Sequence, residues 1–472
     1  MKWFESIYAI GAFIPVVLSS APSSIPQRPS IEATPYNTGR SQPDSPPRDK
    51  DRYCFVQPSS DGEDDAPVIF KAFQECNDGG TVVLDQVYQI GSPLDITFLR
   101  HVDVVITGEI HFDDRDVYYW AENSFKFDFQ NQSTFWKWGG EDINIYGDLS
   151  NDESVIDGHG QAYWEEIQTN KTLLRPMLFA FDGMHQAVMS NLRMRNPPNW
   201  FNLIANSTDI LISNMHLNAT SLDDVEIANS DGWDTYRSDR VVIQDSIIKN
   251  TDGVYGPLSL NNFPESILIL KDCVSFKPNS TNVVVQDLKC TGSHGISVGS
   301  LGQYKDRVDI VENLYIYNIS MTNASDGARI KVWPGIETDF QDNLNGGGGL
   351  GRVKNVTYDT FYHENNDRAI TLTQCYGSSD EALCYEFPAN LTIEDITFRN
   401  MWGTVSDEED PQAGTLVCSA PDRCDNIRAE NITIEVPSGE APVYECVNLD
   451  EGLLDFTCVD SQDDQIFRKD RR

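Results

Sequence analysis

Four short polar blocks in the middle of the chain contain the residues whose types and spacing could do chemistry. They are NSDGWDTY (229–236), KDCVSFKPNS (271–280), GSHGISVGSLGQY (292–304) and ARIKVWPG (328–335). Between them they supply carboxylates, an imidazole and two cations, at Asp231, Asp272, His294, Arg329 and Lys331. A protonated carboxyl that donates to a leaving oxygen, opposite carboxylates that activate water, is the arrangement glycoside hydrolysis requires. The arginine and lysine suit a substrate that carries its own carboxylate.

Short β-branched runs that end in Asn or Asp predict the elements that position these blocks. The runs end at Asn191, Asn214, Asp245, Asp287, Asn318, Asp359, Asn400 and Asn431, with spacings between 23 and 42 residues. A repeat of this kind is typical of a solenoid of parallel β-coils. Motifs one coil apart then lie side by side on one face. A β-sandwich of similar strands is the alternative, although it explains the repeated bend residue less well.

The four blocks resemble the signatures N-T-D, G-D-D, G-H-G and R-I-K of glycoside hydrolase family 28, the polygalacturonase family, in its fungal exopolygalacturonase branch. The resemblance extends from about Tyr53 to Cys458. It implies an all-β fold, the right-handed single-stranded parallel β-helix. It also implies inverting hydrolysis of terminal α-1,4-linked galacturonic acid from the non-reducing ends of pectic polygalacturonan, with no metal or other cofactor.

The resemblance also implies roles for individual residues. Asp231 would help to activate water, and His294 would bind substrate or tune a proton. Arg329 and Lys331 would hold the galacturonate carboxylate, and Tyr376, in the string ITLTQCYG, would contact the substrate. Taken singly, these residues also have structural explanations, such as a turn aspartate or a surface arginine. A second G-H-G string at 158–160 looks like part of a structural early coil.

The aspartate pair of the G-D-D signature is interrupted in this chain. Asp252 is followed by residues 253–271, and only then by Asp272 and Cys273. Removing those 19 residues makes the two aspartates adjacent and shortens the spacing between the bend residues on either side from 42 to 23. We interpret 253–271 as a retained intron, with a genuine active-site loop as the alternative. In the shortened form Asp252 takes the general-acid position and Asp272 the second water-activating one, and the chain as written is predicted to be poorly active.

The two ends of the chain predict export and a single catalytic domain. Residues 1–21 read as a signal peptide, because Lys2 precedes a short apolar core and small residues follow it. A buried N-terminal strand or helix is the alternative. Pro- and Ser-rich residues 22–52 read as a disordered linker or propeptide. The catalytic domain is expected over 53–460, with a charged tail over 461–472.

Cysteines and glycosylation sequons favour a secreted glycoprotein. An even number of cysteines behind a signal peptide predicts disulfides, for which pairing of neighbours is one arrangement: Cys54, Cys76, Cys273, Cys290, Cys375, Cys384, Cys418, Cys424, Cys446 and Cys458. Ten sequons predict N-glycosylation at Asn131, Asn170, Asn206, Asn218, Asn279, Asn318, Asn323, Asn355, Asn390 and Asn431. The sequence contains neither a CxxC nor an HExxH spacing, so no metal site is predicted.

Charge and composition exclude other classes of protein. The chain has 472 residues, with 73 acidic against 35 basic ones and a net charge of −38. Nucleic acid is therefore not an expected partner. No membrane association is expected either, and the chain is expected to be a monomer. Within the family, a rhamnogalacturonan hydrolase or α-rhamnosidase is an alternative activity. Outside that activity, the alternatives are a non-catalytic carbohydrate-binding β-helix and a pectate lyase, which would need a calcium-binding carboxylate cluster.

Overall fold

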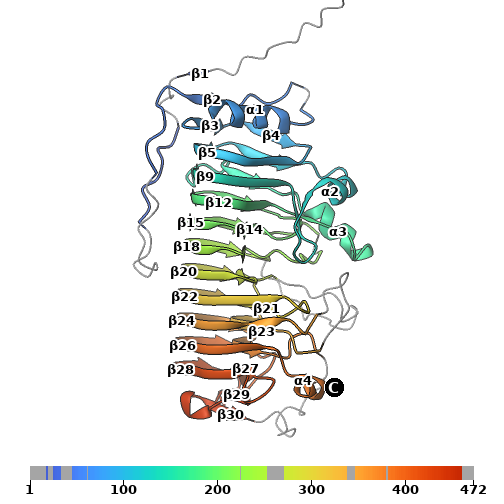
Figure 1. Ribbon diagram of the computed structural model, residues 1–472, viewed down its shortest axis with the longest axis vertical. Helices are drawn as coiled ribbons and strands as arrows, with labels where there is room; N and C mark the ends of the chain where they lie inside the picture. The colour runs from blue at the N-terminus through green and yellow to red at the C-terminus, as the bar shows by residue number, and fades with distance from the viewer. Residues whose placement is uncertain are drawn as a thin grey trace, which may run out of the picture.

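The chain folds as a stack of β-coils (Figure 1). The computed structural model describes residues 18–19, 25–32, 45–60, 62–223, 225–251, 271–336, 346–378 and 381–459. Strands of successive coils pair in parallel, which confirms the predicted right-handed parallel β-helix. This parallel pairing excludes the β-sandwich, whose sheets are antiparallel.

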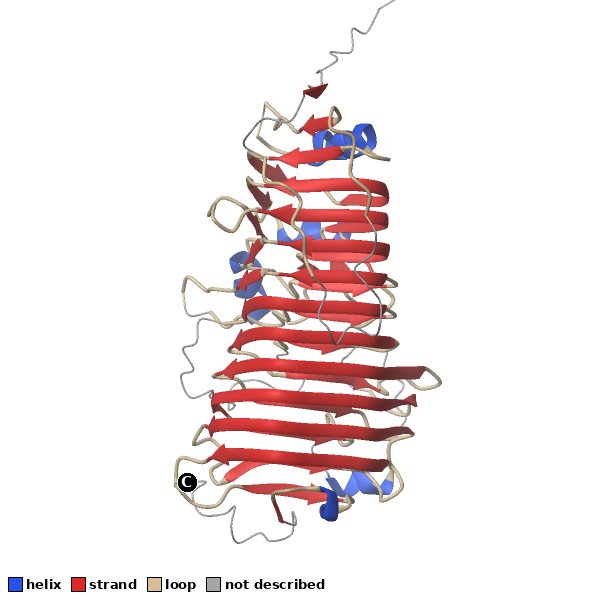
Figure 2. Cartoon of the chain, turned by 90° about the vertical axis from the view of Figure 1, so that its left-hand side faces the viewer, coloured by secondary structure: helices blue, strands red, loops and turns tan. Residues whose placement is uncertain are grey.

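Three parallel sheets run the length of the stack. The long sheet, whose strands are stacked in Figure 2, consists of β2 (Tyr53–Phe55), β3 (Thr81–Leu84), β5 (Leu94–Ile106), β9 (Trp136–Gly147), β12 (Phe179–Ser190), β15 (Thr208–Ser213), β18 (Asp239–Lys249), β20 (Ser280–Thr291), β22 (Val308–Thr322), β24 (Leu350–Asn366), β26 (Leu391–Val405) and β28 (Cys424–Glu435). The side sheet starts with β4 (Val87–Ile90), β6 (Glu109–Phe112), β10 (Val155–Asp157), β13 (Arg193–Arg195) and β16 (His216–Asn218), and continues in the C-terminal parts of the long strands. The third, which we call the site sheet, contains β14 (Asn202–Ala205), β17 (Trp233–Tyr236), β19 (Val274–Phe276), β21 (Ile296–Leu301), β23 (Asp326–Val332), β25 (Arg368–Thr373), β27 (Gln412–Val417), β29 (Val443–Val447) and β30 (Thr457–Val459).

Shorter elements decorate this stack. The helices are α1 (Ala66–Cys76), α2 (Val117–Asn123), α3 (Gln161–Thr169), α4 (Glu381–Glu386) and the 3₁₀ turn η2 (Glu451–Leu453). The short strands are β1 (Leu18–Ser19), β7 (Phe125–Lys126), β8 (Ser133–Thr134) and β11 (Pro176–Met177). Helix α1 buries Ile69 and Phe73 in the core at the N-terminal end of the stack. None of the helices in the described ranges is long and apolar enough to cross a bilayer.

The repeated Asn and Asp residues form the bend between the long sheet and the side sheet. Seven of the eight predicted bend residues have φ between 52° and 58°, the left-handed region that Asn and Asp tolerate best. At the eighth position the next residue, Thr360, takes this conformation instead (φ 64°). The bend side chains stack in ladders, as where Asn431 Nδ2 donates to Asn400 Oδ1 at 2.9 Å. The sequence repeat therefore marks one corner of every coil.

Apolar ladders fill the interior. One of them runs in strict register across the long sheet, through Val241, Val283, Leu314, Val356, Ile396 and Ile427. All six side chains are buried. Burial of each such side chain stabilises the fold by roughly 1.5–3 kcal/mol, so the stack has a continuous core that holds neighbouring strands in register.

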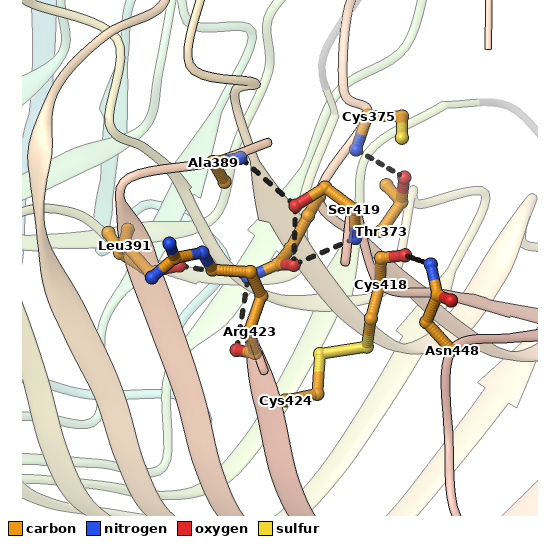
Figure 3. The surroundings of a disulfide bond; sticks show 10 residues. Thr373, Cys375, Ala389, Leu391, Cys418, Ser419, Arg423, Cys424 and Asn448 are labelled. Carbon is orange, nitrogen blue, oxygen red and sulfur yellow. Dashed lines mark hydrogen bonds between the residues drawn. A yellow bond between two sulfur atoms is a disulfide. The ribbon is translucent and has the colours of Figure 1, made fainter. Parts of the chain in front are cut away.

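Five disulfides join cysteines that are neighbours in the sequence: Cys54–Cys76, Cys273–Cys290, Cys375–Cys384, Cys418–Cys424 and Cys446–Cys458. Figure 3 shows the fourth, which joins the turn after β27 to the start of β28. In that turn Ser419 Oγ accepts the Ala389 N–H at 3.0 Å, and the Cys418 carbonyl accepts from Asn448 at 2.8 Å. Each bridge thus fastens a local loop to the stack.

Part of the predicted disordered linker is packed against the long sheet. Arg28 binds Asp103 through two hydrogen bonds of 2.9 Å, and Arg48 lies 3.0 Å from both Asp103 and Asp142. Ile31 packs against an apolar cluster on the outer face of that sheet. Two arginines and an apolar side chain of residues 25–32 and 45–52 thus have partners that a Pro- and Ser-rich composition does not reveal.

Candidate active site

The outward side chains of the site sheet bring the polar blocks together. Residues on neighbouring strands pair in the order Asp234, Ser275, Ser297, Arg329 and Thr371. The strands alternate, so Trp233, Val274, Ile296, Ala328 and Ile370 point into the core beside them. Four blocks that span about a hundred residues of sequence thus form one row across four coils, and Thr371 extends the row to a fifth.

Asp272 lies at the centre of this row and is completely buried. Its Oδ2 lies 2.7 Å from Lys331 Nζ, and its Oδ1 accepts the Ser297 hydroxyl at 2.7 Å. Burial raises the pKa of Asp272, but attraction to Lys331 and then to Lys277 outweighs it and brings that pKa to about 2. Asp272 is therefore an ionised carboxylate that the protein holds in place.

Asp231 and Asp234 form a second buried group around Lys277. Lys277 Nζ lies 3.1 Å from Asp234 Oδ1 and 3.7 Å from Asp231 Oδ2, and all three side chains are fully buried. Burial, followed by repulsion from Asp234, raises the pKa of Asp231 well above its ordinary value. Burial also raises the pKa of Asp234, to about 7, against the attraction of Lys277. These raised pKa values retain a proton on this pair of carboxyls at acidic pH.

Arg329 and His294 lie beside the carboxylates. Arg329 Nη1 is 3.2 Å from Asp326 Oδ2 and 3.4 Å from the His294 carbonyl oxygen, which it reaches as a donor. Its Nε is buried and has no hydrogen-bond partner among the described residues. Desolvation, followed by repulsion from Arg329, lowers the pKa of His294 to about 3, so its imidazole is neutral. The Nε–H of Arg329 is therefore available to donate to an oxygen of a bound ligand.

Two aromatic residues complete the wall on the C-terminal side. The Tyr376 ring lies 5.9 Å from Lys331 Nζ and packs edge-on against Trp333, with ring centroids 5.1 Å apart. Neither the Tyr376 hydroxyl nor the Trp333 Nε1 has a hydrogen-bond partner in the described part of the chain. Such donors are suited to sugar hydroxyl groups. The structure therefore brings Tyr376 beside Lys331.

Of the predicted residues, Asp231, Asp272, His294, Arg329, Lys331 and Tyr376 come together, whereas Asp252 lies outside the described residues. The second G-H-G string is on the side sheet, at the start of α3, and is not among them. All ten predicted sequon asparagines are described; seven are exposed and three are partly exposed. Glycans would thus be accommodated at the surface.

Asp234, Lys277 and Asp326 also belong to this site, although the sequence motifs did not identify them. The first two stand inside blocks that were recognised, WDTY and SFKP, at positions that alternate with core residues. This period of two is the signal that would have found them, because an aspartate between two inward residues of a parallel strand must point to the outer face. Asp326 precedes the R-I-K signature by three residues and has no such motif of its own.

The hairpin of β7 and β8 covers the same face on the N-terminal side of these carboxylates. Phe129 stacks on Tyr236, with ring centroids 4.4 Å apart, in an apolar cluster with Trp200 and outward residues of β12 and β14. At the tip, Gln130 Nε2 donates to Gln303 Oε1 at 2.8 Å, across 173 residues of sequence. The Trp200 ring in turn lies 4.9 Å from Lys277 Nζ. The hairpin therefore closes the face on that side.

Comparison with known proteins places this arrangement in a family. Residues 102–455 match the model of glycosyl hydrolases family 28. The chain is 46% identical over 456 residues to a protein named probable exopolygalacturonase X from Aspergillus fumigatus, which covers 96% of this chain and 99% of that protein. It is 47% identical over 451 residues to exopolygalacturonase A of Aspergillus niger, covering 95% and 98%.

A solved structure agrees with these relatives. The endo-xylogalacturonan hydrolase of Aspergillus tubingensis superposes with a TM-score of 0.71 at 30% identity, over 87% of this chain and 99% of that one. Its match extends the likeness from sequence to the whole coil stack. The chain therefore belongs to glycosyl hydrolases family 28.

Proposed function

We propose that the protein is a secreted exopolygalacturonase, which removes terminal galacturonic acid from the non-reducing ends of polygalacturonan with inversion. The observation that carries this proposal is the buried Asp272–Lys331 pair, which lies beside Arg329 and beside the buried group of Asp231, Asp234 and Lys277. Carboxylates supply the acid and base chemistry of glycoside hydrolysis, and the cations match a uronate rather than a neutral sugar. They thereby favour galacturonate over the rhamnose-containing alternatives.

In the proposed reaction the glycosidic C1–O bond breaks as water adds to C1 from the opposite face of the ring. Asp252 would give its proton to the leaving oxygen, the ionised Asp272 would take a proton from the water, and Asp231 would help to position that water. Lys331, which already binds Asp272, and Arg329, with its unpartnered Nε, would hold the sugar carboxylate. His294 and Tyr376 would contact the substrate beside them.

The hairpin of β7 and β8 supports exo action. A polymer that crosses the strands would meet Phe129 and the Gln130–Gln303 contact beside Trp200. An internal bond could then reach the carboxylates only if the hairpin moved, whereas a chain end could enter from the open side. A carbohydrate-binding module or a lyase would not need the buried carboxyls Asp231 and Asp272 beside this hairpin.

Product analysis on polygalacturonate, with the chain that lacks 253–271, tests the proposal. Release of monomer alone is expected, while a ladder of oligomers would indicate endo action and no product would indicate a binding module. Asp272→Asn should lower kcat at least a hundredfold with an unchanged circular dichroism spectrum. Asp422→Asn, a change at an exposed carboxylate, is the matched control and should leave kcat unchanged.

The flanks of 253–271 support its interpretation as a retained intron. Asn250 Nδ2 donates to the Asp272 carbonyl at 3.3 Å, so the residues before and after the insertion lie together. The strand before the insertion, β18, pairs in register over nearly its whole length with β20, the next strand of the long sheet. Excision would therefore add no gap, and it would make Asp252 and Asp272 adjacent.

Deleting 253–271 should raise kcat on oligogalacturonate by about a hundredfold or more, because a positioned general acid contributes on the order of 10²–10⁴. Steady-state rates of both forms, with thermal melting as the control for folding, provide the measurement. Equal rates would favour the genuine active-site loop, and a transcript that encodes GVYGPLSL would refute the intron directly.

Three observations support export: the predicted signal peptide, the five disulfides and the surface position of the sequons. We expect a monomer whose partner is the pectic substrate. Mass spectrometry of the culture medium, before and after glycosidase treatment, tests both export and glycosylation. Retention of residues 1–21 in the recovered protein would count against the signal peptide.

A further inference from the structure

The second G-H-G string brings a histidine into a cluster that the proposed reaction does not use. His159 Nε2 lies 2.9 Å from His111 Nδ1 and 3.7 Å from Asp157 Oδ2. One potential ligand atom from each of the three residues lies within 4.8 Å of the others. The register of β6 and β10 places Asp157 opposite His111, and His159 follows two residues later.

Both imidazoles have a carboxylate behind them. The second ring nitrogen of His111, Nε2, lies 3.4 Å from Glu109 Oε2, and that of His159, Nδ1, lies 3.7 Å from Asp114 Oδ2. A metal-ligating histidine almost always presents its other nitrogen to a carboxylate, a carbonyl or a water, which fixes its orientation. Here the same arrangement occurs twice, with the inner nitrogens turned toward each other.

Arg195 orders the acidic side of the cluster. Its Nε donates to Asp157 Oδ2 and its Nη2 to Glu109 Oε1, both at 2.5 Å. Asp157 Oδ1 accepts the backbone N–H of His159 at 3.0 Å. With neutral imidazoles, the three carboxylates and the one guanidinium leave a net charge of −2, which a divalent cation would balance.

We infer that His111, His159 and Asp157 bind a divalent transition metal of the zinc class. Two imidazole nitrogens and a carboxylate oxygen are ligands that zinc takes, and a fourth position would remain for water. Zinc–nitrogen bonds of about 2.0–2.1 Å require nitrogens roughly 3.3 Å apart, so the rings need to separate only slightly. Imidazoles suit zinc, copper or nickel, whereas calcium and magnesium prefer oxygen ligands.

The site is separate from the catalytic row. His111 and Asp157 are on β6 and β10 of the side sheet, which directly precede α2 and α3 in the chain, whereas the proposed catalytic carboxylates adjoin the site sheet. A hydrogen bond of 2.6 Å from Tyr118 to Glu166 already links α2 to α3. A bound metal would therefore fasten two successive coils and their helices without touching the substrate, and this inference does not depend on the proposed function.

Isothermal titration of the full, EDTA-treated chain with ZnCl₂ tests the inference. We expect one zinc per chain, no heat from CaCl₂ or MgCl₂, and at least a tenfold weaker affinity in both His111→Asn and His159→Asn. His185→Asn is the matched control, because His185 is half exposed, has no second histidine beside it and should leave zinc binding unchanged. Zinc binding that persists in both variants, or a stoichiometry near zero, would overturn the site.

Electron paramagnetic resonance of the Cu²⁺-loaded native chain gives a readout that requires no variant. Hyperfine coupling from two imidazole nitrogens is expected at one equivalent of copper. A spectrum without nitrogen coupling would contradict the assigned ligands even if the histidine variants failed to fold.

Discussion

At the scale of single residues, the proposed site holds similar carboxyls in different charge states. Asp231, Asp234 and Asp272 are all fully buried, yet Asp272 is held ionised by Lys331 while the other two share Lys277. Divergent pKa values among neighbouring carboxyls are the usual basis for different acid and base roles. The ion pairs, rather than burial alone, therefore decide which carboxyl can accept a proton from water.

Replacing Lys331 by methionine should raise KM for oligogalacturonate by about 10- to 100-fold, because a charge-assisted contact to the sugar carboxylate is lost. The same change removes the nearest cation from Asp272, so the pKa of Asp272 should rise and the acidic limb of the kcat profile should move to higher pH. Lys289→Met, on the solvent-facing side of β20, is the control. An unchanged acidic limb would contradict this role.

Replacing Asp234 by asparagine should reduce the loss of stability that occurs as the pH rises from acidic to neutral. The pKa of Asp234 is raised from its ordinary value to about 7, so the folded state binds a proton that the unfolded state releases near pH 4. The resulting stabilisation is complete below pH 4 and lost as the pH rises to 7. The wild-type Tm should therefore fall between pH 5 and pH 8, and it should fall less in Asp234→Asn. Parallel melting curves for the two proteins would contradict this.

The sequence predicted most of this row because its motifs are short and local. The alternation of the strands could have placed Asp234 and Lys277 on the outer face, but not their roles, because these depend on a contact between coils. A pairing of Lys277 with two carboxylates requires three dimensions.

At the scale of elements, we expect the hairpin of β7 and β8 to admit the end of a substrate chain and to exclude its internal bonds. Replacing residues 127–132 by Asn-Gly should shorten the hairpin and allow longer substrates across the carboxylates. Oligomers should then appear among the products of polygalacturonate, with a faster fall in viscosity for each bond cleaved. Gln130→Ala, which removes only the contact with Gln303, should give the same change to a smaller degree. Monomer as the sole product of both folded variants would show that the hairpin does not set exo action.

The conformation of the bend residues can be predicted from the sequence, whereas the packing of the N-terminal residues 25–32 cannot. Bend residues were predictable because the left-handed conformation selects Asn and Asp in each coil. The packing of residues 25–32 was not, because it depends on Asp103 and on an apolar cluster far along the chain. Local composition contains no information about such partners.

At the scale of the whole molecule, the net charge of −38 opposes a polyanionic substrate. Long-range attraction cannot recruit the polymer, so binding depends on the cations within the site. At about 0.1 M salt the screening length is roughly 10 Å, which weakens the general repulsion more than the contacts at Arg329 and Lys331. KM for a short oligogalacturonate should therefore fall as salt rises from about 0.01 to 0.1 M, and also at acidic pH. A KM that increases steadily with salt would contradict this.

The contact between Asn250 and Asp272 bears on what a transcript that retains 253–271 would encode. The register between β18 and β20 is intact in a chain that contains the insertion, so the coil stack does not depend on its removal. A transcript that kept this segment would then encode a protein able to fold, acquire its disulfides and pass through the secretory pathway. Splicing of this one segment would then change the catalytic activity of the secreted enzyme, while the quantity of that enzyme stayed the same.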